Sequence, residues 1–510
     1  MKRNLLSVIV LFVSTLSFGQ GEIDAYRYSN NDLSGTARGQ AMGGAFGALG
    51  GDVTGVAINP AGIGIYRRSE VLANMSLTSP VISGNTNRES NTNFHFDNLS
   101  YISYYPLVKG DMLSLNFGFN YNRTKNFNQR YSASRKTMSS SLTDYLALLT
   151  NGIQQSAFDH NPYNNSNIPW LSVLAWDGYL IDPGNSDNNY VSILNKGESV
   201  SPNLKVSEKG NVESYDFTLG SNISNRFYWG ATLSLIELSY EMTSKYDEQF
   251  LGVAKTGFSL ENSLLTKGSG IQVKAGVIIR ATDELRLGIS YHSPIWYTMT
   301  DYYWAVVTPR GIYDDNGDFA GKTSTPDNAA GSYNFRTPGS WTLSMATILG
   351  AQAILSLDYE IKDYSAMNLK DSNGNDWKDV NDIMNDDYKN TSTIRAGFEY
   401  LFTPQLSGRL GYAWAQNPYR PSIKNLGEII VTSGTIPHYV LSDCTSYMTA
   451  GIGYKFTPQF YGDFALVLRS QNDDLYYFPP VGSDGVAADS FQGTYTNKTL
   501  KGLVTLGYRF

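Results

Sequence analysis

The sequence predicts an all-β protein: a transmembrane antiparallel β-barrel of about 14 strands with an N-terminal hatch that plugs the lumen. Three observations support this. The chain ends on a strictly alternating strand, in which Leu500, Val504, Leu506, Tyr508 and Phe510 share one face. Similar strands recur along the chain, and short turns alternate with long connections. A soluble sandwich also alternates, but it has no reason to place its short and long connections at opposite ends.

The N-terminus predicts export. Lys2 and Arg3 precede an apolar run over residues 5–18, which indicates a signal peptide at residues 1–20 and a mature chain that starts near Gly21. The run is shorter than the ~20 residues that a membrane-spanning helix needs. Together with the final strand, this predicts the outer membrane of a Gram-negative bacterium, reached with the help of the barrel-assembly machinery.

Composition fits one large architecture. The 510 residues include 36 Tyr and 48 Gly with only 17% charged residues, and neither a Pro-rich nor a Ser-rich linker divides them. A net charge of -7 gives no basic surface for nucleic acid. The single cysteine, Cys444, cannot form an internal disulfide, so stability must come from strand pairing.

The alternating segments place the barrel at residues 69–510. The expected strands lie near 70–79, 98–107, 112–122, 213–223, 226–240, 270–280, 284–292, 333–348, 351–361, 392–402, 405–415, 446–456, 459–469 and 499–510. The longest connection expected is 124–210. An even number of strands places both ends of the barrel on the side with the short turns.

Charges of both signs fall on the predicted lumen face, which indicates a wet interior. They are Lys274, Arg280, Arg286, Asp358, Glu360, Arg395, Glu399, Arg409, Asp463 and Arg469. Cross-strand pairing is the role we expect for them, and none is assigned to a substrate.

Residues 21–68 are too long for a leader strand and are predicted to form the hatch. Their glycines and alanines allow close backbone packing, and Pro60 would disrupt a central strand. A disordered periplasmic tail is the alternative, but the segment carries more apolar residues than disorder usually does.

At these residues the chain resembles a known family. Arg38 to Gly51, with Ala-Met-Gly-Gly-Ala-Phe at 41–46, and the triplet Asn59, Pro60 and Ala61 are similar to the hatch of FadL-type long-chain fatty acid transporters, in the Bacteroidetes variant often labelled a hemin receptor. The resemblance implies a hatch that contains Asn59-Pro60-Ala61 and blocks the lumen until a hydrophobic molecule binds, with exit sideways into the membrane lipid through an opening in the wall. Passive uptake is the simpler expectation, because no segment for coupling to an inner-membrane motor is evident. Pro106 and Pro338-Gly339 are the candidates for that opening, with ordinary bulges as the alternative.

The longest connection contains two apolar segments at an exposed position. They contribute Leu142, Tyr145, Leu146, Leu149, Trp170, Leu174 and Trp176. The first group has helical spacing after two serines. We expect either a capture site for a hydrophobic ligand or a small satellite core, and the two are compatible.

Other functions have less support. The four histidines, His95, His160, His292 and His438, show no informative spacing, so heme is a weaker ligand candidate than a fatty acid. No cofactor, metal site or catalytic constellation is predicted, and Asp-rich segments at 314–318 and 371–376 are interpreted as turns. An accessory barrel that binds protein cargo for a secretion system remains the alternative from another class.

Overall fold

The computed structural model describes residues 21–510 except 82–86, 89–91, 109, 253–255, 328, 351, 425–429, 484–485 and 489. The signal peptide predicted for residues 1–20 lies outside the described residues. None of the helices in this part of the chain is long and apolar enough to cross a bilayer.

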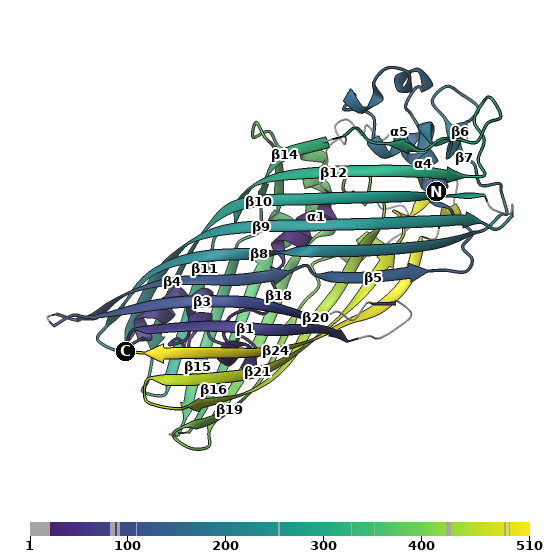
Figure 1. Cartoon of the computed structure of the whole chain (residues 1–510). Coiled ribbons are helices and arrows are strands. Elements are labelled where there is room, and N and C mark those ends of the chain that lie inside the picture. The colour runs from purple at the N-terminus through teal and green to yellow at the C-terminus, as the bar shows by residue number, and fades with distance from the viewer. Residues whose placement is uncertain are drawn as a thin grey trace, which may run out of the picture.

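Fourteen antiparallel strands form a closed barrel, as the sequence predicted (Figure 1). Eleven are continuous: β1 (Glu70–Val81), β3 (Asn93–Pro106), β4 (Met112–Asn126), β8 (Val200–Ile223), β9 (Phe227–Phe250), β10 (Gly257–Arg280), β18 (Asn390–Leu401), β19 (Leu406–Ala415), β20 (Tyr439–Lys455), β21 (Phe460–Tyr476) and β24 (Phe491–Arg509). Three are interrupted: β11 (Leu285–His292) with β12 (Trp296–Arg310), β14 (Ala329–Arg336) with β15 (Ser340–Leu349), and β16 (Ala353–Asp363) with β17 (Asn368–Asp371). Pairing of β1 with β24, from Glu70↔Arg509 to Val81↔Lys498, closes the ring.

Several strands extend far beyond the ranges expected from the sequence. β8, β9 and β10 have 24 residues each, whereas a tilted strand needs only about 9–11 to cross a bilayer. They are longer because the face that carries the apolar side chains changes along each strand, from the outer face to the lumen face. In β9, Leu233 and Leu235 face outward and are 47% and 44% exposed, whereas Leu238 and Tyr240, farther along, face the lumen and are buried. Residues 200–212, 241–250, 257–269 and 296–310 are therefore strand where loops were expected.

Two of the interrupted strands are bonded to each other at the point where they break. At the facing breaks between β11 and β12 and between β14 and β15, the Ile295 amide donates to Thr337 Oγ1 (2.9 Å) and the Thr337 amide donates to the Ile295 carbonyl (3.1 Å). Pro338 and Gly339 therefore lie at a bridged bend. Pro106, the other candidate, ends β3 and faces Ser114 in the ladder with β4.

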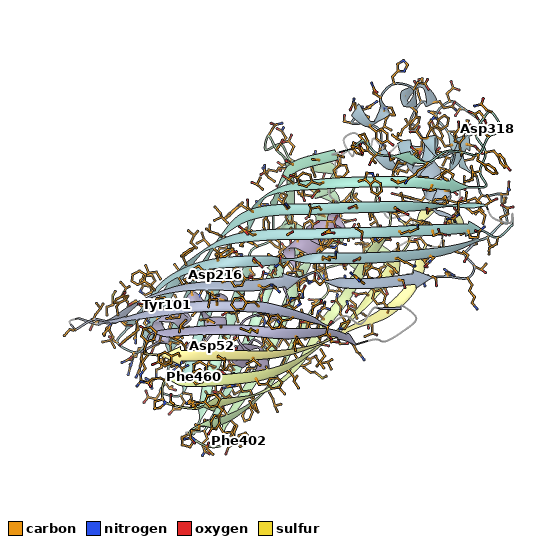
Figure 2. The ribbon with its side chains drawn as sticks, in the orientation of Figure 1. Asp52, Tyr101, Asp216, Asp318, Phe402 and Phe460 are labelled. Carbon is orange, nitrogen blue, oxygen red and sulfur yellow. The ribbon has the colours of Figure 1, made fainter. Side chains whose placement is uncertain are left out.

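The two ends of the barrel differ. Exposed aromatics such as Phe402 and Phe460 mark the short-turn end, and Asp318 lies at the long-loop end (Figure 2). A helical layer, comprising α4, α5, β6 and β7, caps the long-loop end (Figure 1). Its elements and the other connecting pieces are β2 (Asn87–Arg88), β5 (Gln129–Ser134), α4 (Leu142–Thr150), η3 (Gln155–Phe158), η4 (Pro162–Asn164), α5 (Trp170–Asp177), β6 (Ile181–Pro183), β7 (Tyr190–Ser192), β13 (Thr323–Ser324), η5 (Tyr364–Ala366), α6 (Lys378–Asp387), η6 (Pro421–Lys424), β22 (Val481–Ser483) and β23 (Val486–Ala488).

The segment before β1 folds inside the barrel. It forms α1 (Glu22–Ser29), α2 (Ala37–Ala41), α3 (Val53–Ile58) and η2 (Pro60–Ile65). The segment from α2 to η2 packs against strands around much of the ring, with contacts to β8, β9, β10, β19, β20, β21 and β24. We call residues 21–66 the hatch.

Candidate transport site

The hatch has its own internal ties. Thr36 caps α2 by accepting a hydrogen bond from the Gly39 amide (3.0 Å), and Asp52 caps α3 by accepting one from the Thr54 amide (2.9 Å). The Thr36 hydroxyl also donates to Asp52 Oδ1 (2.9 Å), so the two caps hold each other. Short helices of five and six residues gain little stability alone. Mutual capping and packing therefore fix this part of the hatch.

The triplet Asn59, Pro60 and Ala61 joins the hatch to the wall. Asn59 Oδ1 accepts from the Ala61 amide (3.1 Å), while Nδ2 donates to the carbonyls of Gly47 (2.9 Å) and Val277 (3.2 Å). Pro60 occupies the start of η2, where its missing N–H leaves no donor unpaired. Ala61 is fully buried against Tyr228 and Ile278. The Asn59 side chain thus forms hydrogen bonds with η2, with the preceding hatch loop and with β10.

Glycines on the lumen face of the wall allow the hatch to sit this close. A Cβ added at Gly220 would lie 2.5 Å from Ile63 Cγ2, and one at Gly397 would lie 2.5 Å from the Met42 carbonyl oxygen. The same obstruction applies around the ring. These positions, which we call the glycine seat, are Gly118, Gly220, Gly230, Gly276, Gly288, Gly397, Gly411 and Gly451.

Charged wall residues hold the side of the hatch opposite η2. Arg38 donates to both oxygens of Glu399 (2.9 Å each), and Arg409 bridges Glu399 and Asp463 at 2.5 Å each. The side chains of Arg409 and Asp463 are only 6% and 5% exposed. Such hydrogen-bonded pairs in a water-poor setting are strong and directional.

Backbone groups of the hatch are bonded in the same way. Asp358 Oδ2 accepts from the amides of Phe46 and Gly47 (3.0 Å each), and Arg286 donates to the Leu49 carbonyl (2.7 Å). Of the charged residues noted in the sequence, Lys274 does form a cross-strand pair, with Asp216 at 3.4 Å. Arg395 with Glu360, and Arg409 with Glu399 and Asp463, are further cross-strand pairs. Glu399, Asp358 and Arg286 also bind the hatch, which the sequence did not reveal.

The two apolar segments of the longest connection fold together in the helical layer. Ser141 caps α4 in a capping box with Asp144. Of the residues predicted for capture, Leu142, Leu146, Trp170 and Leu174 are buried, and Tyr145, Leu149 and Trp176 are partly buried against the same core. Trp176 stacks on Phe158 at 5.4 Å between ring centroids. These residues, which we call the satellite core, are the outer part of one large apolar core that also includes Tyr28 of α1. Any capture surface must be built from the partly exposed members of the satellite core and their neighbours.

A cavity of about 460 Å³ lies in the lumen beside α1 and reaches the wall at β3 and β4. The ladder between these strands stops at Asn98↔Asn122, and β4 gives way to β5 after Phe127 and Asn128. Beyond that pair, a side-chain contact links the two edges, between His95 Nε2 and Asn126 Nδ2 at 2.9 Å. We call this separation the wall window; no proline marks it in the sequence.

The four histidines lie in separate surroundings. His160 is exposed in the helical layer, His292 contacts the Ile58 carbonyl of the hatch (2.8 Å), and His95 borders the wall window. Burial, with nearby Arg27, lowers the pKa of His438 to about 3. Within the described ranges, no three His, Cys, Asp or Glu side chains are grouped as a metal site.

Comparisons with known proteins agree with this architecture. The model of the family described as outer membrane protein transport protein (OMPP1/FadL/TodX) matches residues 214–510, more than half of the chain. No curated protein matches. A FadL homologue of Pseudomonas aeruginosa has a similar solved structure, with a TM-score of 0.56 and 14% identity over 94% of this chain and 99% of that one. The toluene transporter TbuX of Ralstonia pickettii gives a TM-score of 0.49 and 14% identity over 93% and 98% of the two chains. At these identities the solved structures show the fold alone.

Proposed function

Because this chain belongs to the outer-membrane transport family OMPP1/FadL/TodX, we propose that it takes up long-chain fatty acids, as one class of hydrophobic small molecule, by passive and hatch-gated transport. The family and the barrel place it in the Gram-negative outer membrane. The observation that carries the proposal is the hatch: it packs against strands around much of the ring, so cargo cannot pass without displacing it or leaving sideways.

The wall window supports the sideways route. A fatty chain gains about 0.8 kcal/mol per CH₂ when it leaves water, so a wet path toward the periplasm is unfavourable for it. The window adjoins the lumen cavity and is bordered on the outer face by Phe94, which is 65% exposed. Cargo that reaches the cavity from the long-loop end would leave through the window and enter the apolar membrane lipid.

Locking the hatch to the wall tests the proposal. The Ala37 amide donates to Thr505 Oγ1 at 2.8 Å, so cysteines at these two positions are close enough for a disulfide trial. The pair Ala37→Cys/Thr505→Cys is made with Cys444→Ser, and uptake of radiolabelled palmitate is measured in cells that lack their own transporter. We expect uptake over the background of barrel-free cells, loss of most of it on oxidation, and recovery on reduction.

The matched control is Thr505→Cys alone, which cannot lock the hatch and should transport under both conditions. Palmitate uptake that equals the barrel-free background in the reduced protein would contradict the choice of cargo. Full uptake by the oxidised pair would contradict hatch gating.

A further inference from the structure

The outer face of the barrel shows where the membrane lipid ends. On β9 the outward apolar side chains run from Phe227 to Leu235, and on β10 they run from Ile279 to Ile271. Each series has about the length of ~9–11 residues that a tilted strand needs to cross a bilayer. Trp296 on β12 is 51% exposed and pairs with Ile271, so it marks the same boundary. Beyond this row, toward the long-loop end, the outward surface lies above the hydrocarbon of the membrane.

The first outward rows beyond the boundary are polar. β9, β10 and β12 run side by side on this face of the barrel (Figure 1). On β10 and β12, Ser269 and Thr298 form the first row, and Lys267 and Thr300 form the second. Such side chains suit water and polar head groups, so the register places the end of the hydrocarbon at Trp296.

Two aromatic side chains lie above these polar rows. Tyr302 and Trp304 face outward on β12 and are 46% and 38% exposed. Neither has a hydrogen bond or a ring contact with any residue that the structure describes. In the ladder, Tyr302 lies between Leu265 and the small side chain of Ala330, which leaves room beside the ring. Grouped apolar side chains in a polar surface mark a site of interaction, whereas single ones do not.

The height of this aromatic pair separates it from the aromatic belt of the membrane interface. Belt residues lie at the level of the lipid head groups, where Trp296 is found on this face. At ~3.4 Å per residue, Tyr302 lies ~20 Å farther along the strand, or ~14 Å higher at a tilt of about 45°. Phospholipid head groups add only roughly 5–8 Å on each side of the hydrocarbon. A phospholipid therefore ends below the pair, and a lipid that reaches it needs a taller head group.

Two exposed cations lie between the lipid boundary and the aromatic pair. They are Lys267 on β10 and Arg336 on β14, and neither forms an ion pair among the described residues. Arg336 donates to a backbone carbonyl (3.3 Å), which leaves its charge uncompensated. Glu237 and Glu241 are diagonal neighbours of Lys267, but Glu241 is paired with Lys209 at 3.9 Å. A cation at this level can bind a phosphate group.

The patch is too small for a protein partner. Tyr302, Trp304 and Leu265 contribute far less than the ~800 Å² per partner that a stable protein interface buries. In a Gram-negative outer membrane, the outer leaflet is built largely of glycolipids, whose sugars extend above the level of a phospholipid head group. One face of a sugar ring carries C–H groups that pack on an aromatic ring, and its hydroxyl groups suit a polar surrounding.

We propose that the outward face of β10, β12 and β14 binds a phosphorylated glycolipid of the outer leaflet. Its acyl chains lie on the apolar surface below Trp296, and its phosphate group binds Lys267 and Arg336. Its sugars pack on Tyr302 and Trp304. This site lies outside the lumen and does not depend on the cargo that the barrel transports.

Native mass spectrometry of the purified full-length barrel, in a neutral maltoside detergent, tests the site. Three probes are titrated: a lipopolysaccharide with a complete core oligosaccharide, lipid A, which lacks that core, and phosphatidylglycerol. We expect the lipopolysaccharide to bind about tenfold more tightly than lipid A, because only its core sugars reach Tyr302 and Trp304. Phosphatidylglycerol should bind most weakly, since its head group ends below both rings.

Variants locate the binding. The double variant Tyr302→Ala/Trp304→Ala should lose the tenfold preference and bind lipid A as the wild type does. Lys267→Gln should weaken both phosphorylated glycolipids about threefold, as expected for an exposed charged contact. The controls are Tyr313→Ala, an exposed aromatic residue beyond β12, and Lys245→Gln, a half-exposed lysine of β9; both should bind as the wild type does. Heat-modified mobility on gels checks that each variant folds as a barrel.

Equal affinity for lipopolysaccharide and lipid A in the wild type would overturn the proposal. A double variant that keeps the tenfold preference would also overturn it. Unchanged binding in Lys267→Gln would overturn the phosphate contact. The same spectra report the number of chains, and a dimer that is lost only in the double variant would assign the surface to a second copy of the barrel instead.

Discussion

Apolar contacts hold the hatch mainly toward the long-loop end of the barrel, where α1 is also hydrogen-bonded through Glu22 and Ser29. Toward the long-loop end, α1 joins a large apolar core, in which Tyr28 packs with Phe127 and Tyr240 at centroid distances of 6.5 and 5.7 Å. Toward the short-turn end, α2 to η2 rest on the glycine seat and on directed bonds such as Arg38 to Glu399. Apolar burial is non-directional, so it persists when the packed surfaces shift. A hydrogen bond is lost when its donor and acceptor separate.

This difference suggests which part of the hatch moves first. A hydrophobic ligand competes directly with the apolar contacts of α1, because both bury the same kind of surface. The polar seat offers such a ligand nothing in exchange for its bonds. We therefore expect two steps. In one, the ligand displaces α1; in the other, the segment from α2 to η2 leaves the glycine seat. The variants below affect these steps separately.

The largest effect is expected from Glu399→Ala. Its removal leaves Arg38 and Arg409 without their shared carboxylate in a mostly buried site, which costs about 3–5 kcal/mol. Hydrogen exchange of residues 35–50, measured by mass spectrometry, should rise strongly while the strands stay protected. Glu261→Ala removes an exposed partner of Lys245 and is the control, with an expected cost below about 1 kcal/mol. Equal exchange in the two variants would show that the charged contact does not hold the hatch.

The glycine seat is tested by Gly411→Ala. The new methyl group would collide with the backbone at Met42 and Gly43 and lie 2.5 Å from Thr449 Oγ1, so overpacking should cost about 1–3 kcal/mol. Exchange at residues 42–47 should rise, and large antibiotics should enter cells faster. Gly502→Ala is matched, since its nearest neighbour is Leu466 Cδ2 at 3.8 Å. If the methyl group at 411 left exchange unchanged, the seat would be looser than the structure shows.

The sequence predicted the membrane-crossing part of the fold because that part follows one rule. Outward apolar residues such as Leu113 and Leu115 must face lipid, and their alternation located all fourteen strands. The long extensions were missed because, beyond the lipid, the apolar side chains lie on the lumen face of the strands instead of the outer face. An inward apolar series such as Leu238, Tyr240 and Met242 preserves alternation on the opposite face, and it could have been recognised as a strand.

The site was less predictable for a geometric reason. Asn59, Pro60 and Ala61 were found through a family resemblance, but the glycines that receive them are scattered from 118 to 451. Only the register of the closed ring brings these glycines to one level, and register depends on pairings that a single sequence does not specify. The wall window was missed because the prediction looked for proline, whereas the ladder ends at Asn98↔Asn122.

A third prediction concerns the helical layer at the long-loop end, beyond the membrane. Glu248 is buried there and accepts hydrogen bonds from the Leu142 amide (3.1 Å) and the Tyr246 hydroxyl (2.5 Å). Burial raises its pKa from 4.5 to about 7. Between pH 4.5 and about 7, the Glu248 carboxyl is therefore protonated in the folded state and ionised in the unfolded state. Its contribution to stability is fully present below pH 4.5 and is lost as the pH rises through about 7.

Local opening of α4 should accordingly become easier by up to about 1.4 kcal/mol per pH unit within that window, after correction for intrinsic exchange. Exchange of residues 142–150 is measured from pH 4.5 to 8 in the wild type and in Glu248→Gln. The amide side chain cannot titrate, so this variant should lose the pH dependence while the seat residues 35–66 are unaffected. A slope that persists in Glu248→Gln would assign it to another group.

The smallest effect is expected at the surface of the satellite core, where ligand capture was predicted. Leu148 is 39% exposed on α4, so Leu148→Ser removes apolar surface without opening a buried cavity. If this surface captures cargo, losing the equivalent of about one buried CH₂, or ~0.8 kcal/mol, should weaken uptake about fourfold at low palmitate concentration. Uptake at saturating palmitate should not change, because the hatch is untouched. Leu251→Ser, 49% exposed beyond the end of β9, is the matched control. Equal uptake curves for both variants would restrict the satellite core to a structural role and place capture in the lumen beside α1.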